Sequence, residues 1–499
     1  MTNYPSITTA LQSLLQYGID NDLIYPEDTL VVRNQLIDVL HLSSWDDPSP
    51  LPVESIDNLL GQISTYAAEH GVIEDTGGSK ERFETRVMGL FTPMPHDVRQ
   101  TFCAQYKVSP EQATNWYYTF SQKTNYVRME AIQKNLCWKY DSPYGPLDIT
   151  INLSKPEKDP KDIAAAKLAP QTKYPHCQLC LENEGFAGTT THPARQNLRP
   201  VPITVGGSTW YFQYSPYGYY NEHCIVFREE HVPMVIDADV FGKLFDVLDI
   251  FPHYFIGSNA DLPIVGGSIL THEHFQGGRY TFAMDNAPIE TSYNLPAYPE
   301  VEGGILKWPL SVIRLRSANR TQLEAACARV LAAWRPYSDP EVEILAETDG
   351  TPHNTITPIA RKDGNTYVCD LVLRNNRTTP ERPLGLFHPR PALHHIKKEN
   401  IGLIEVMGLA VLPARLAKEL DDMAEVLVHG VTAQFPDLAP HWEWLEDIRA
   451  RRNDITAESA PRIVKEEIGY VFQQVLEDAG VFRRDDQGHQ AFLKFMQTL

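Results

Sequence analysis

The segment GGSILTHEHFQGG, residues 266–278, places two imidazoles and an amide at alternate positions between two pairs of glycines. In an extended chain, residues i and i+2 point to the same side, so we predict that His272, His274 and Gln276 project together from one strand. The flanking glycines permit a bulky ligand to approach the main chain. A single histidine is usually structural, but three polar side chains on one face amid bare backbone favour a functional role.

The spacing of the two histidines argues against a zinc protease. The helical signature of those enzymes has histidines four residues apart, with a glutamate between them that serves as the base. In an extended segment Glu273 points away from both histidines, so the sequence predicts a different chemistry.

A second cluster is the pair Cys177 and Cys180 in the motif CQLC. Two thiolates at this spacing can hold a tetrahedral zinc ion together with two further ligands, and redox-active pairs use the same spacing. A glutamate-rich turn, LENEG, follows the motif, whereas thioredoxin-like chemistry requires a helix there. Two unpaired cysteines are the structural alternative. The candidates for the third and fourth ligands are His231, His272, His192 and His223.

Charge and cysteine content limit the classes of partner. The net charge of −20 over 499 residues argues against nucleic acid or an anionic membrane as the main partner, although a locally basic pocket can still bind a phosphorylated substrate. Seven scattered cysteines fit a reducing compartment rather than a disulfide framework. The sequence has no basic, apolar leader at its start and no long apolar run. We therefore predict a cytoplasmic protein.

The alternation of patterns along the chain predicts an α+β fold. We expect a helical N-terminal region over residues 1–145, a strand-and-helix unit over 146–300 that carries the histidines, a second such unit over 301–430, and a helical tail over 431–499. Residues 201–214 predict a hairpin that turns at Gly206-Gly207. The apolar run 401–406 predicts another strand.

Two helix starts have capping signals. Ser109, followed by Pro110 and by Gln112 at the third helical position, predicts the start of a long aromatic-rich helix. Thr321 and Glu324 have the spacing of a capping box and predict a second start.

Several blocks of sequence resemble one known family. CQLCLENEGFAG, HPARQNLR, WYFQYSPYGYYNEHCIVF, REEHVPM and GGSILTHEHFQGG occur here in the order found in the galactose-1-phosphate uridylyltransferases. DITINLSKPEKDPK and HNTITPIARKDG resemble more closely the second class of that family, found in low-GC Gram-positive bacteria. The resemblance implies two units related to the histidine-triad (HIT) nucleotide-binding fold, extra helices at both ends, and a homodimer.

The resemblance also implies roles for the central residues. In the first class of the family the corresponding segment reads His-Pro-His-x-Gln, and its second histidine attacks phosphorus while the glutamine holds a phosphoryl oxygen. His274 and Gln276 occupy those positions here, with Glu273 in place of the proline. The chemistry requires no cofactor, but the first histidine of the segment is a ligand of a zinc ion. The corresponding ligands here are Cys177, Cys180, His231 and His272.

A further set of residues is predicted to bind the substrates. Arg195, Arg199 and Lys397 are the candidates for a local basic patch in this acidic chain. Glu405, in IGLIEVMG, matches a glutamate that contacts sugar hydroxyls in the family, and Asn259 matches an asparagine near the phosphates. The remaining candidates are the main-chain amides at Gly267 and Ser268 and the nucleotide-contacting residues Tyr214, Ser215 and Tyr217.

The activity implied is uridylyl transfer from UDP-glucose to galactose 1-phosphate by double displacement, through a nucleotide bonded to His274. Neutral imidazole, whose ordinary pKa is about 6.5, is an available nucleophile near pH 7. Its other ring nitrogen needs a hydrogen-bond acceptor, for which we predict a main-chain carbonyl of the glycine-rich segment. Two alternatives remain open: a dinucleoside-polyphosphate phosphorylase or hydrolase of the same superfamily, and a non-catalytic zinc-stabilised binding protein.

Overall fold

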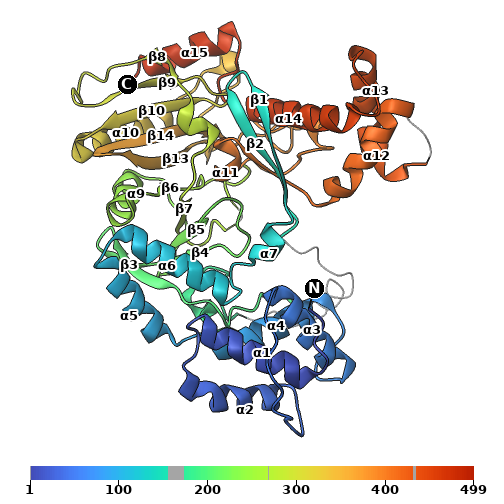
Figure 1. The fold of residues 1–499 in the computed structure, drawn as a ribbon. Coiled ribbons are helices and arrows are strands. Elements are labelled where there is room, and N and C mark those ends of the chain that lie inside the picture. Colours follow the sequence, from blue (N-terminus) through green and yellow to red (C-terminus); the bar gives the residue numbers. More distant parts are fainter. Residues whose placement is uncertain (1, 155–172, 268, 431–433) are drawn as a thin grey trace. The chain divides into compact units, whose positions relative to one another are not determined.

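The computed structural model describes residues 2–154, 173–267, 269–430 and 434–499. Ser268, a predicted substrate contact, lies outside these residues. The chain forms two compact units: unit 1 contains residues 1–134 and 154–232, and unit 2 contains residues 135–153 and 233–499. Figure 1 shows helices and sheets in both, so the predicted α+β class is confirmed.

Unit 1 combines a set of helices with one antiparallel meander. Strand β3 pairs with β4, and β4 pairs with β5. The described elements are α1 (Ile7–Asp20), η1 (Pro26–Asp28), α2 (Thr29–Val39), α3 (Ile56–Glu69), α4 (Gly77–Phe91), α5 (Pro95–Tyr106), α6 (Pro110–Lys123), α7 (Met129–Ile132), η2 (Leu181–Asn183), β3 (Val201–Val205), β4 (Ser208–Tyr214) and β5 (Cys224–Arg228).

Local signals in unit 1 have the predicted effect. The Ser109 side chain accepts a hydrogen bond from the main-chain nitrogen of Gln112 and caps α6. Val205 pairs with Ser208, so Gly206 and Gly207 alone form the turn between β3 and β4. Their φ angles are 57° and 71°, a backbone conformation that only glycine adopts without strain. The predicted hairpin is therefore confirmed.

Unit 2 contains the remaining elements. Its strands are β1 (Leu136–Ser142), β2 (Gly145–Ile151), β6 (Phe255–Gly257), β7 (His274–Gly278), β8 (Ile289–Ser292), β9 (Glu302–Leu306), β10 (Val312–Ser317), β11 (Glu347–Thr348), β12 (Thr351–Pro352), β13 (Asn354–Asp363), β14 (Thr366–Asn375) and β15 (Leu409–Leu412). Its helices are α9 (Asp239–Ile250), η3 (Ala283–Asn286), α10 (Arg320–Trp334), η4 (Pro340–Val342), η5 (Pro391–Leu393), α11 (Leu403–Val406), α12 (Arg415–His429), η6 (Pro436–His441), α13 (Trp442–Arg451), α14 (Ala460–Ala479) and α15 (Asp486–Met496).

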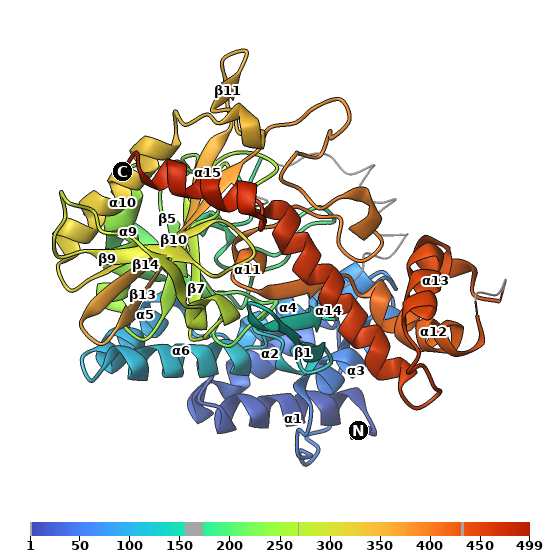
Figure 2. The ribbon, with the colours of Figure 1, turned by 90° about the horizontal axis from the view of Figure 1, so that it is seen from above.

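The main sheet of unit 2 has the strand order β7-β6-β13-β14-β10-β9-β8, and all its pairs are antiparallel. Helices α9 and α10 pack on one of its faces (Figure 2). The Phe245 ring of α9 lies 5.1 Å from the ring of Tyr367 on β14, and α9 also contacts β6 and β13. Helices α9 and α10 therefore cover the face of the sheet to which Tyr367 points.

The chain order repeats one pattern. A three-stranded meander, a helix and an antiparallel pair occur first as β3-β4-β5, α9 and β6-β7, and then as β8-β9-β10, α10 and β13-β14. The division into strand-and-helix units over residues 146–300 and 301–430 stays a prediction. The relation of these units to the histidine-triad fold stays a prediction.

Three local predictions are wrong. The helical region does not extend to residue 145, because β1 begins at Leu136, and none of the residues of β1 is fully buried. The run 401–406 forms the short helix α11, and the strand follows as β15. A short apolar run fits either a strand or a helix. Helix α10 is capped by Asn319, two residues before Thr321.

Helices α12 to α15 form the predicted helical end of the chain. They extend the helical tail upstream of residue 431, because α12 begins at Arg415. In the part of the chain that the structure describes, no helix combines the length and the apolar character that a membrane crossing requires.

A chain of hydrogen bonds links the buried His441 to the half-buried His395 in this region. His441 Nε2 donates to Glu419 Oε2 at 3.1 Å, and its Nδ1 lies 2.8 Å from His395 Nδ1. One Nδ1 must donate and the other accept, so a further proton on either ring would place two N–H groups against each other. Burial and the charge of Arg415 lower the pKa of His395 to about 4, and burial, His395 and Arg415 lower that of His441 to about 3.

We expect this pair to make the stability of the protein decrease in mild acid. Both groups stay neutral in the folded chain, whereas in the unfolded chain they take up protons as the pH falls through about 6.5. The stability that the neutral pair contributes to the folded state is therefore complete above pH 6.5 and is lost as the pH falls towards 4. Between pH 6 and 5 the pair should lower the free energy of unfolding by about 2 kcal/mol.

Urea unfolding midpoints at pH 7, 6 and 5 measure this effect. In His441→Gln the decrease in the free energy of unfolding between pH 6 and 5 should be about half as large as in the wild type, because one titrating group is removed. The exposed His70 is the control, and His70→Gln should follow the wild type. An equal pH dependence in all three proteins would show that the pair does not titrate in this way.

Candidate active site

The antiparallel pair β6-β7 positions the histidine segment. Gln276 pairs with Gly257, and the pairing ends at Gly278 opposite Phe255. Strand β7 begins at His274, so His274 and Gln276 share one face, whereas His272 lies in the bend before the strand. The prediction of one extended segment from His272 onward is wrong in this respect: the strand begins two residues later, and its pairing with β6 covers only Gln276 to Gly278.

The His274 ring is held in one tautomer. Its Nδ1 lies 2.8 Å from the carbonyl oxygen of His272, and since a carbonyl only accepts, Nδ1 carries the hydrogen. The lone pair is therefore on Nε2. Burial lowers the pKa of His274 to about 4, so the ring is neutral near pH 7. The predicted main-chain carbonyl partner in the glycine-rich segment is confirmed.

The Glu273 side chain forms an ion pair with helix α9. Its Oε1 lies 2.5 Å from Nζ of Lys243, which belongs to α9. The Glu273 carboxylate is therefore held by a lysine of α9. This agrees with the exclusion of the zinc-protease arrangement.

Asn259 and Gly267 lie against each other in the loop between β6 and β7. A Cβ on Gly267 would lie 2.5 Å from Asn259 Nδ2, so only glycine permits this approach. Asn259 Oδ1 accepts a hydrogen bond of 3.1 Å from the main-chain nitrogen of Leu403, at the start of α11. The amide is thereby oriented by an element far away in the sequence.

Glu405 and Lys397 belong to the same group of side chains. Lys397 Nζ lies 2.9 Å from Glu405 Oε1 and also donates to the carbonyl of Val411. Glu405 Oε2 accepts from the nitrogen of Gly402, next to Leu403. Four residues predicted from separate parts of the sequence are therefore connected within unit 2 through the start of α11: Asn259, Gly267, Lys397 and Glu405.

The predicted substrate contacts of unit 1 have partners within that unit. Arg199 is buried and its guanidinium donates to main-chain carbonyls, among them that of Pro93 at 2.7 Å. The Tyr214 hydroxyl donates to the carbonyl of Thr114, and the main-chain nitrogen of Tyr217 donates to Ser215 Oγ at 3.4 Å. Arg195 lies over the ring of Tyr126. Their contacts to substrate stay predictions.

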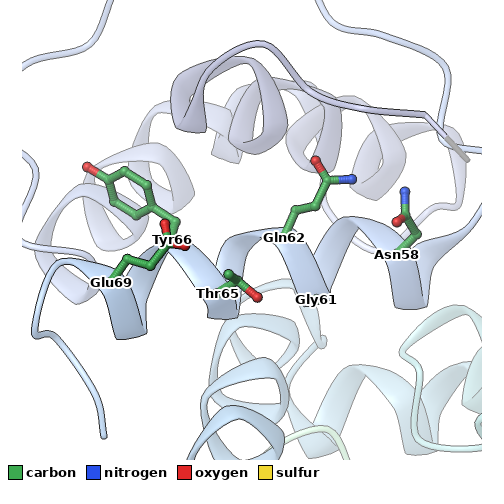
Figure 3. A pocket seen from close by; sticks show the side chains of 6 residues that line it. All are labelled: Asn58, Gly61, Gln62, Thr65, Tyr66 and Glu69. Carbon is green, nitrogen blue, oxygen red and sulfur yellow. The ribbon is translucent and has the colours of Figure 1, made fainter. Parts of the chain in front are cut away.

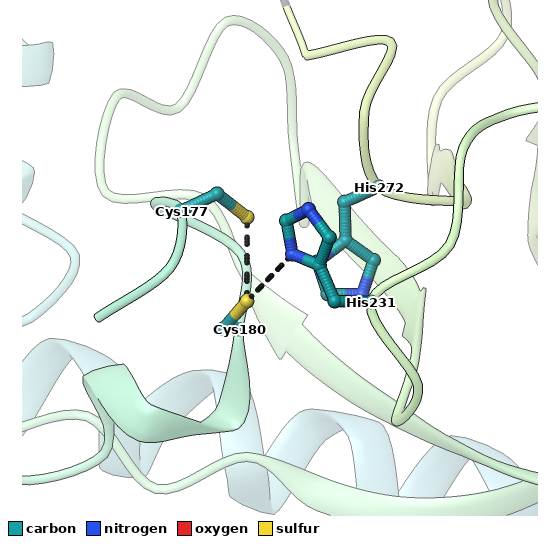
Figure 4. A group of neighbouring side chains, drawn as sticks. All are labelled: Cys177, Cys180, His231 and His272. Carbon is teal, nitrogen blue, oxygen red and sulfur yellow. Dashed lines mark hydrogen bonds between the residues drawn. The ribbon is translucent and has the colours of Figure 1, made fainter. Parts of the chain in front are cut away.

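The two cysteines of the CQLC motif meet one of the candidate histidines. Cys180 Sγ lies 3.5 Å from Cys177 Sγ and 3.0 Å from Nδ1 of His231, which follows β5 (Figure 4). Burial and the neighbouring Cys177 raise the pKa of Cys180 to about 12. Figure 4 also draws His272, which belongs to unit 2, so its place as fourth ligand stays a prediction.

The donor set of these three residues fits zinc. Two ligands on a tetrahedral zinc ion with bonds of about 2.3 Å are roughly 3.8 Å apart, and the observed separations are close to this edge. The ligand atoms lie within 4.8 Å of one another. Of the other candidates, His192 Nε2 is bonded to Asn183 Oδ1, and His223 packs against the Tyr220 ring. The turn after the motif is η2, as its sequence predicts.

Two polar residues on the main sheet were missed by the sequence analysis. Thr357 on β13 and Arg374 on β14 are almost completely buried, yet Thr357 Oγ1 and the Nε and Nη1 atoms of Arg374 have no hydrogen-bond partner among the described residues. The only signal in the sequence is the arginine at the end of an apolar strand run, VCDLVLRN.

A surface hollow on α3 holds none of the predicted site residues (Figure 3). Two of its lining residues, Asn58 and Gln62, donate to the carbonyl of Thr2 and so fix the start of the chain. The hollow is lined by Asn58, Gly61, Gln62, Thr65, Tyr66 and Glu69.

Comparison with known proteins gives matches along nearly the whole chain. Two family models match: Galactose-1-phosphate uridyl transferase, N-terminal domain, over residues 25–233, and the C-terminal domain of the same family over residues 247–444. A galactose-1-phosphate uridylyltransferase of Fusobacterium nucleatum is 50% identical over 504 residues, covering 99% of both chains. That of Bacillus subtilis is 46% identical over 503 residues, covering 99% of this chain and 98% of its own.

The chain is also similar to a solved structure. That structure is the yeast Ap4A phosphorylase Apa2, with a TM-score of 0.33 and 12% identity, covering 71% of this chain and 96% of that one. A likeness at this level carries no argument about fold or activity.

Proposed function

The chain belongs to the galactose-1-phosphate uridylyltransferase family, and from this membership we propose that it converts UDP-glucose and galactose 1-phosphate into glucose 1-phosphate and UDP-galactose. The two hexose phosphates are alike in size and charge, so a double displacement lets one pocket serve both in turn. The alternatives, a dinucleoside-polyphosphate enzyme and a non-catalytic binding protein, have no observation in their favour.

His274 is the proposed nucleophile. Its Nε2 lone pair attacks the α-phosphorus of UDP-glucose, the bond from that phosphorus to the bridging oxygen breaks, and the electron pair leaves with glucose 1-phosphate. The product is a uridylyl group bonded to Nε2. In the second half-reaction a phosphate oxygen of galactose 1-phosphate attacks the same phosphorus and the electron pair returns to Nε2. No proton needs to leave the ring, because the hydrogen stays on Nδ1.

Neighbouring side chains have proposed supporting roles. Gln276, on the same strand face as His274, would donate from its amide to a non-bridging oxygen of the α-phosphoryl group, where charge increases in the transition state. Asn259 and the main chain at Gly267 would hold the adjacent phosphate. Glu405, fixed by Lys397, would accept from sugar hydroxyls. In unit 1, we propose Arg195, Arg199, Tyr214, Ser215 and Tyr217 as the nucleotide contacts.

The observation that carries the proposal is the buried, neutral His274 ring with its lone pair fixed on Nε2. Isotope exchange tests it directly. Labelled glucose 1-phosphate incubated with UDP-glucose and protein, without galactose 1-phosphate, should enter UDP-glucose, because the first half-reaction is reversible and needs no acceptor. Exchange that requires galactose 1-phosphate would contradict double displacement. Diadenosine polyphosphate in place of UDP-glucose should give no turnover.

We further propose a structural zinc ion held by Cys177, Cys180 and His231, with His272 as the fourth ligand. Bound zinc would deprotonate the two thiols and join the loop after β5 to the CQLC turn. If His272 is a ligand, the metal would also hold the carbonyl that bonds to Nδ1 of His274. The resemblance also supports a cytoplasmic homodimer, which light scattering would detect as about twice the chain mass of 56.5 kDa.

Removal of one thiol is expected to remove the metal and to lower thermal stability. Cys180→Ser should lower the zinc content from about one ion per chain to nearly none, because a hydroxyl is a poor zinc ligand. The unfolding temperature should fall, since zinc that binds only the folded state stabilises it. Elemental analysis and thermal unfolding measure both.

The exposed Cys103 provides a matched control. Cys103→Ser should keep both zinc content and unfolding temperature. Wild-type protein that is purified without chelator and contains no zinc would contradict the proposal.

A further inference from the structure

The face of the main sheet opposite α9 and α10 is identified by three contacts within unit 2. A Cβ on Gly257 of β6 would lie 2.8 Å from Leu403 Cδ1, and the Asn259 side chain bonds to Leu403 N. Arg374 Nη2 donates to the carbonyl of Ile401 at 2.7 Å. Residues of β6, of β14 and of the loop after β6 therefore all lie against the segment 401–405. We call this side of the sheet the polar face.

The strand register places His274 on the same face. Gln276 lies opposite Gly257, Gly257 opposite Ile359, and Ile359 opposite Asp370. Residues opposite each other in antiparallel pairs share a face, as do residues two apart on one strand. These paired residues form one row across the strands. The next row on the same face lies two residues further along each strand and contains His274, Asn259, Thr357 and Val372.

Arg374 is two residues beyond Val372, opposite Thr355. It is a diagonal neighbour of Thr357, a separation that a long side chain can span. Strand β14 is three strands from β7, about 14 Å at the usual spacing. Thr357 thus lies in the row of His274 and Asn259, and Arg374 lies in the next row of the polar face, against the segment that carries Glu405.

Other polar side chains on the polar face have hydrogen-bond partners, unlike Thr357 and two nitrogens of Arg374 among the described residues. Thr355 Oγ1 donates to Asp261 Oδ1 at 2.6 Å, and Arg314 forms two bonds with the carboxylate of Asp370. In contrast, Thr357 Oγ1 and Nε and Nη1 of Arg374 have no partner in the described residues, although the side chains are only 1% and 2% exposed. Buried donors left unpaired are costly, which points to a ligand that supplies the missing acceptors.

We propose that Thr357 and Arg374 bind the hexose 1-phosphate, the leaving group of the first half-reaction and the acceptor of the second; this inference rests on the proposed uridylyl transfer. A guanidinium offers paired donors that match phosphate oxygens. A hydroxyl beside it adds one more donor. The hexose 1-phosphate, and not the nucleotide, is assigned to this part of the polar face because the segment that meets it carries Glu405, the proposed partner of the sugar hydroxyls.

Binding of two separate ligands tests the assignment. Glucose 1-phosphate and UMP are titrated calorimetrically into wild-type protein, Thr357→Val and Arg374→Met. Thr357→Val should weaken glucose 1-phosphate roughly tenfold and Arg374→Met roughly a hundredfold, the range for hydrogen bonds to charged groups. The affinity for UMP should change by no more than about twofold. Thr355→Val is the matched control, because its hydroxyl is paired with Asp261, and it should bind both ligands as wild type does.

The outcomes separate this inference from the proposed function. Equal losses for both ligands, or unchanged binding of both, would overturn the inference and assign these donors to the fold or to ordered water. If Arg374→Met does not fold, Thr357→Val decides alone, since valine has the same shape as threonine. Wild-type protein without glucose 1-phosphate exchange would overturn the proposed function itself, whatever the variants bind.

Discussion

His274→Asn is expected to carry no label after incubation with UDP-glucose labelled in the uridine, whereas the wild type retains close to one label per active chain. Asparagine keeps a polar side chain but has no lone pair suited to attack phosphorus, so the covalent step has no nucleophile. Turnover should fall by at least about four orders of magnitude, the usual scale for loss of a nucleophile. The label should be released by acid and stable to base, as expected of a phosphorus–nitrogen bond.

His353 is the matched control for this experiment. It is a buried histidine whose Nδ1 and Nε2 are bonded to Asn376 and Thr348, and it has no part in the proposed chemistry. His353→Gln should retain label as the wild type does. Label that remains on His274→Asn would place the nucleotide on another residue and contradict the mechanism.

Features set by neighbours in the sequence could be predicted. The Gly206-Gly207 turn follows from the glycines themselves, and the cap on α6 follows from Ser109 and Gln112. The acceptor for Nδ1 of His274 is the carbonyl of a residue two positions away. The residues alone left the histidine partner of the CQLC motif as a choice among four, because the distance along the chain to His231 carries no geometric information; the family resemblance selected His231.

Features set by distant pairing could not be predicted. Strand β7 begins at His274 and not at His272, and nothing in the segment itself shows where its pairing with other strands begins. The run 401–406 has too few residues to distinguish helical from strand periodicity. The bond between His395 and His441 joins residues 46 positions apart. Thr357 and Arg374 lie in strands whose sequence gives no sign that their donors are unpaired.

The second large effect is expected at Gln276. Gln276→Ala should lower the rate of uridylylation in a single turnover by about a hundredfold to a thousandfold, the effect of removing one donor that stabilises charge in a transition state. The affinity for UDP-glucose should change much less, because the charge on the α-phosphoryl oxygens increases only as the bond to the leaving group breaks.

Gln213, a buried glutamine on β4 of unit 1, is the control for this position. Gln213→Ala should keep the single-turnover rate within a few-fold. The role of Gln276 follows from whether its removal lowers the single-turnover rate or the affinity for UDP-glucose. A large loss of affinity with an unchanged rate would show that Gln276 binds the substrate as strongly in the ground state as in the transition state. If the Gln276 amide stabilises the transition state at the α-phosphorus in both half-reactions, both should slow by about a hundredfold. Both half-reactions form or break the same bond between that phosphorus and His274.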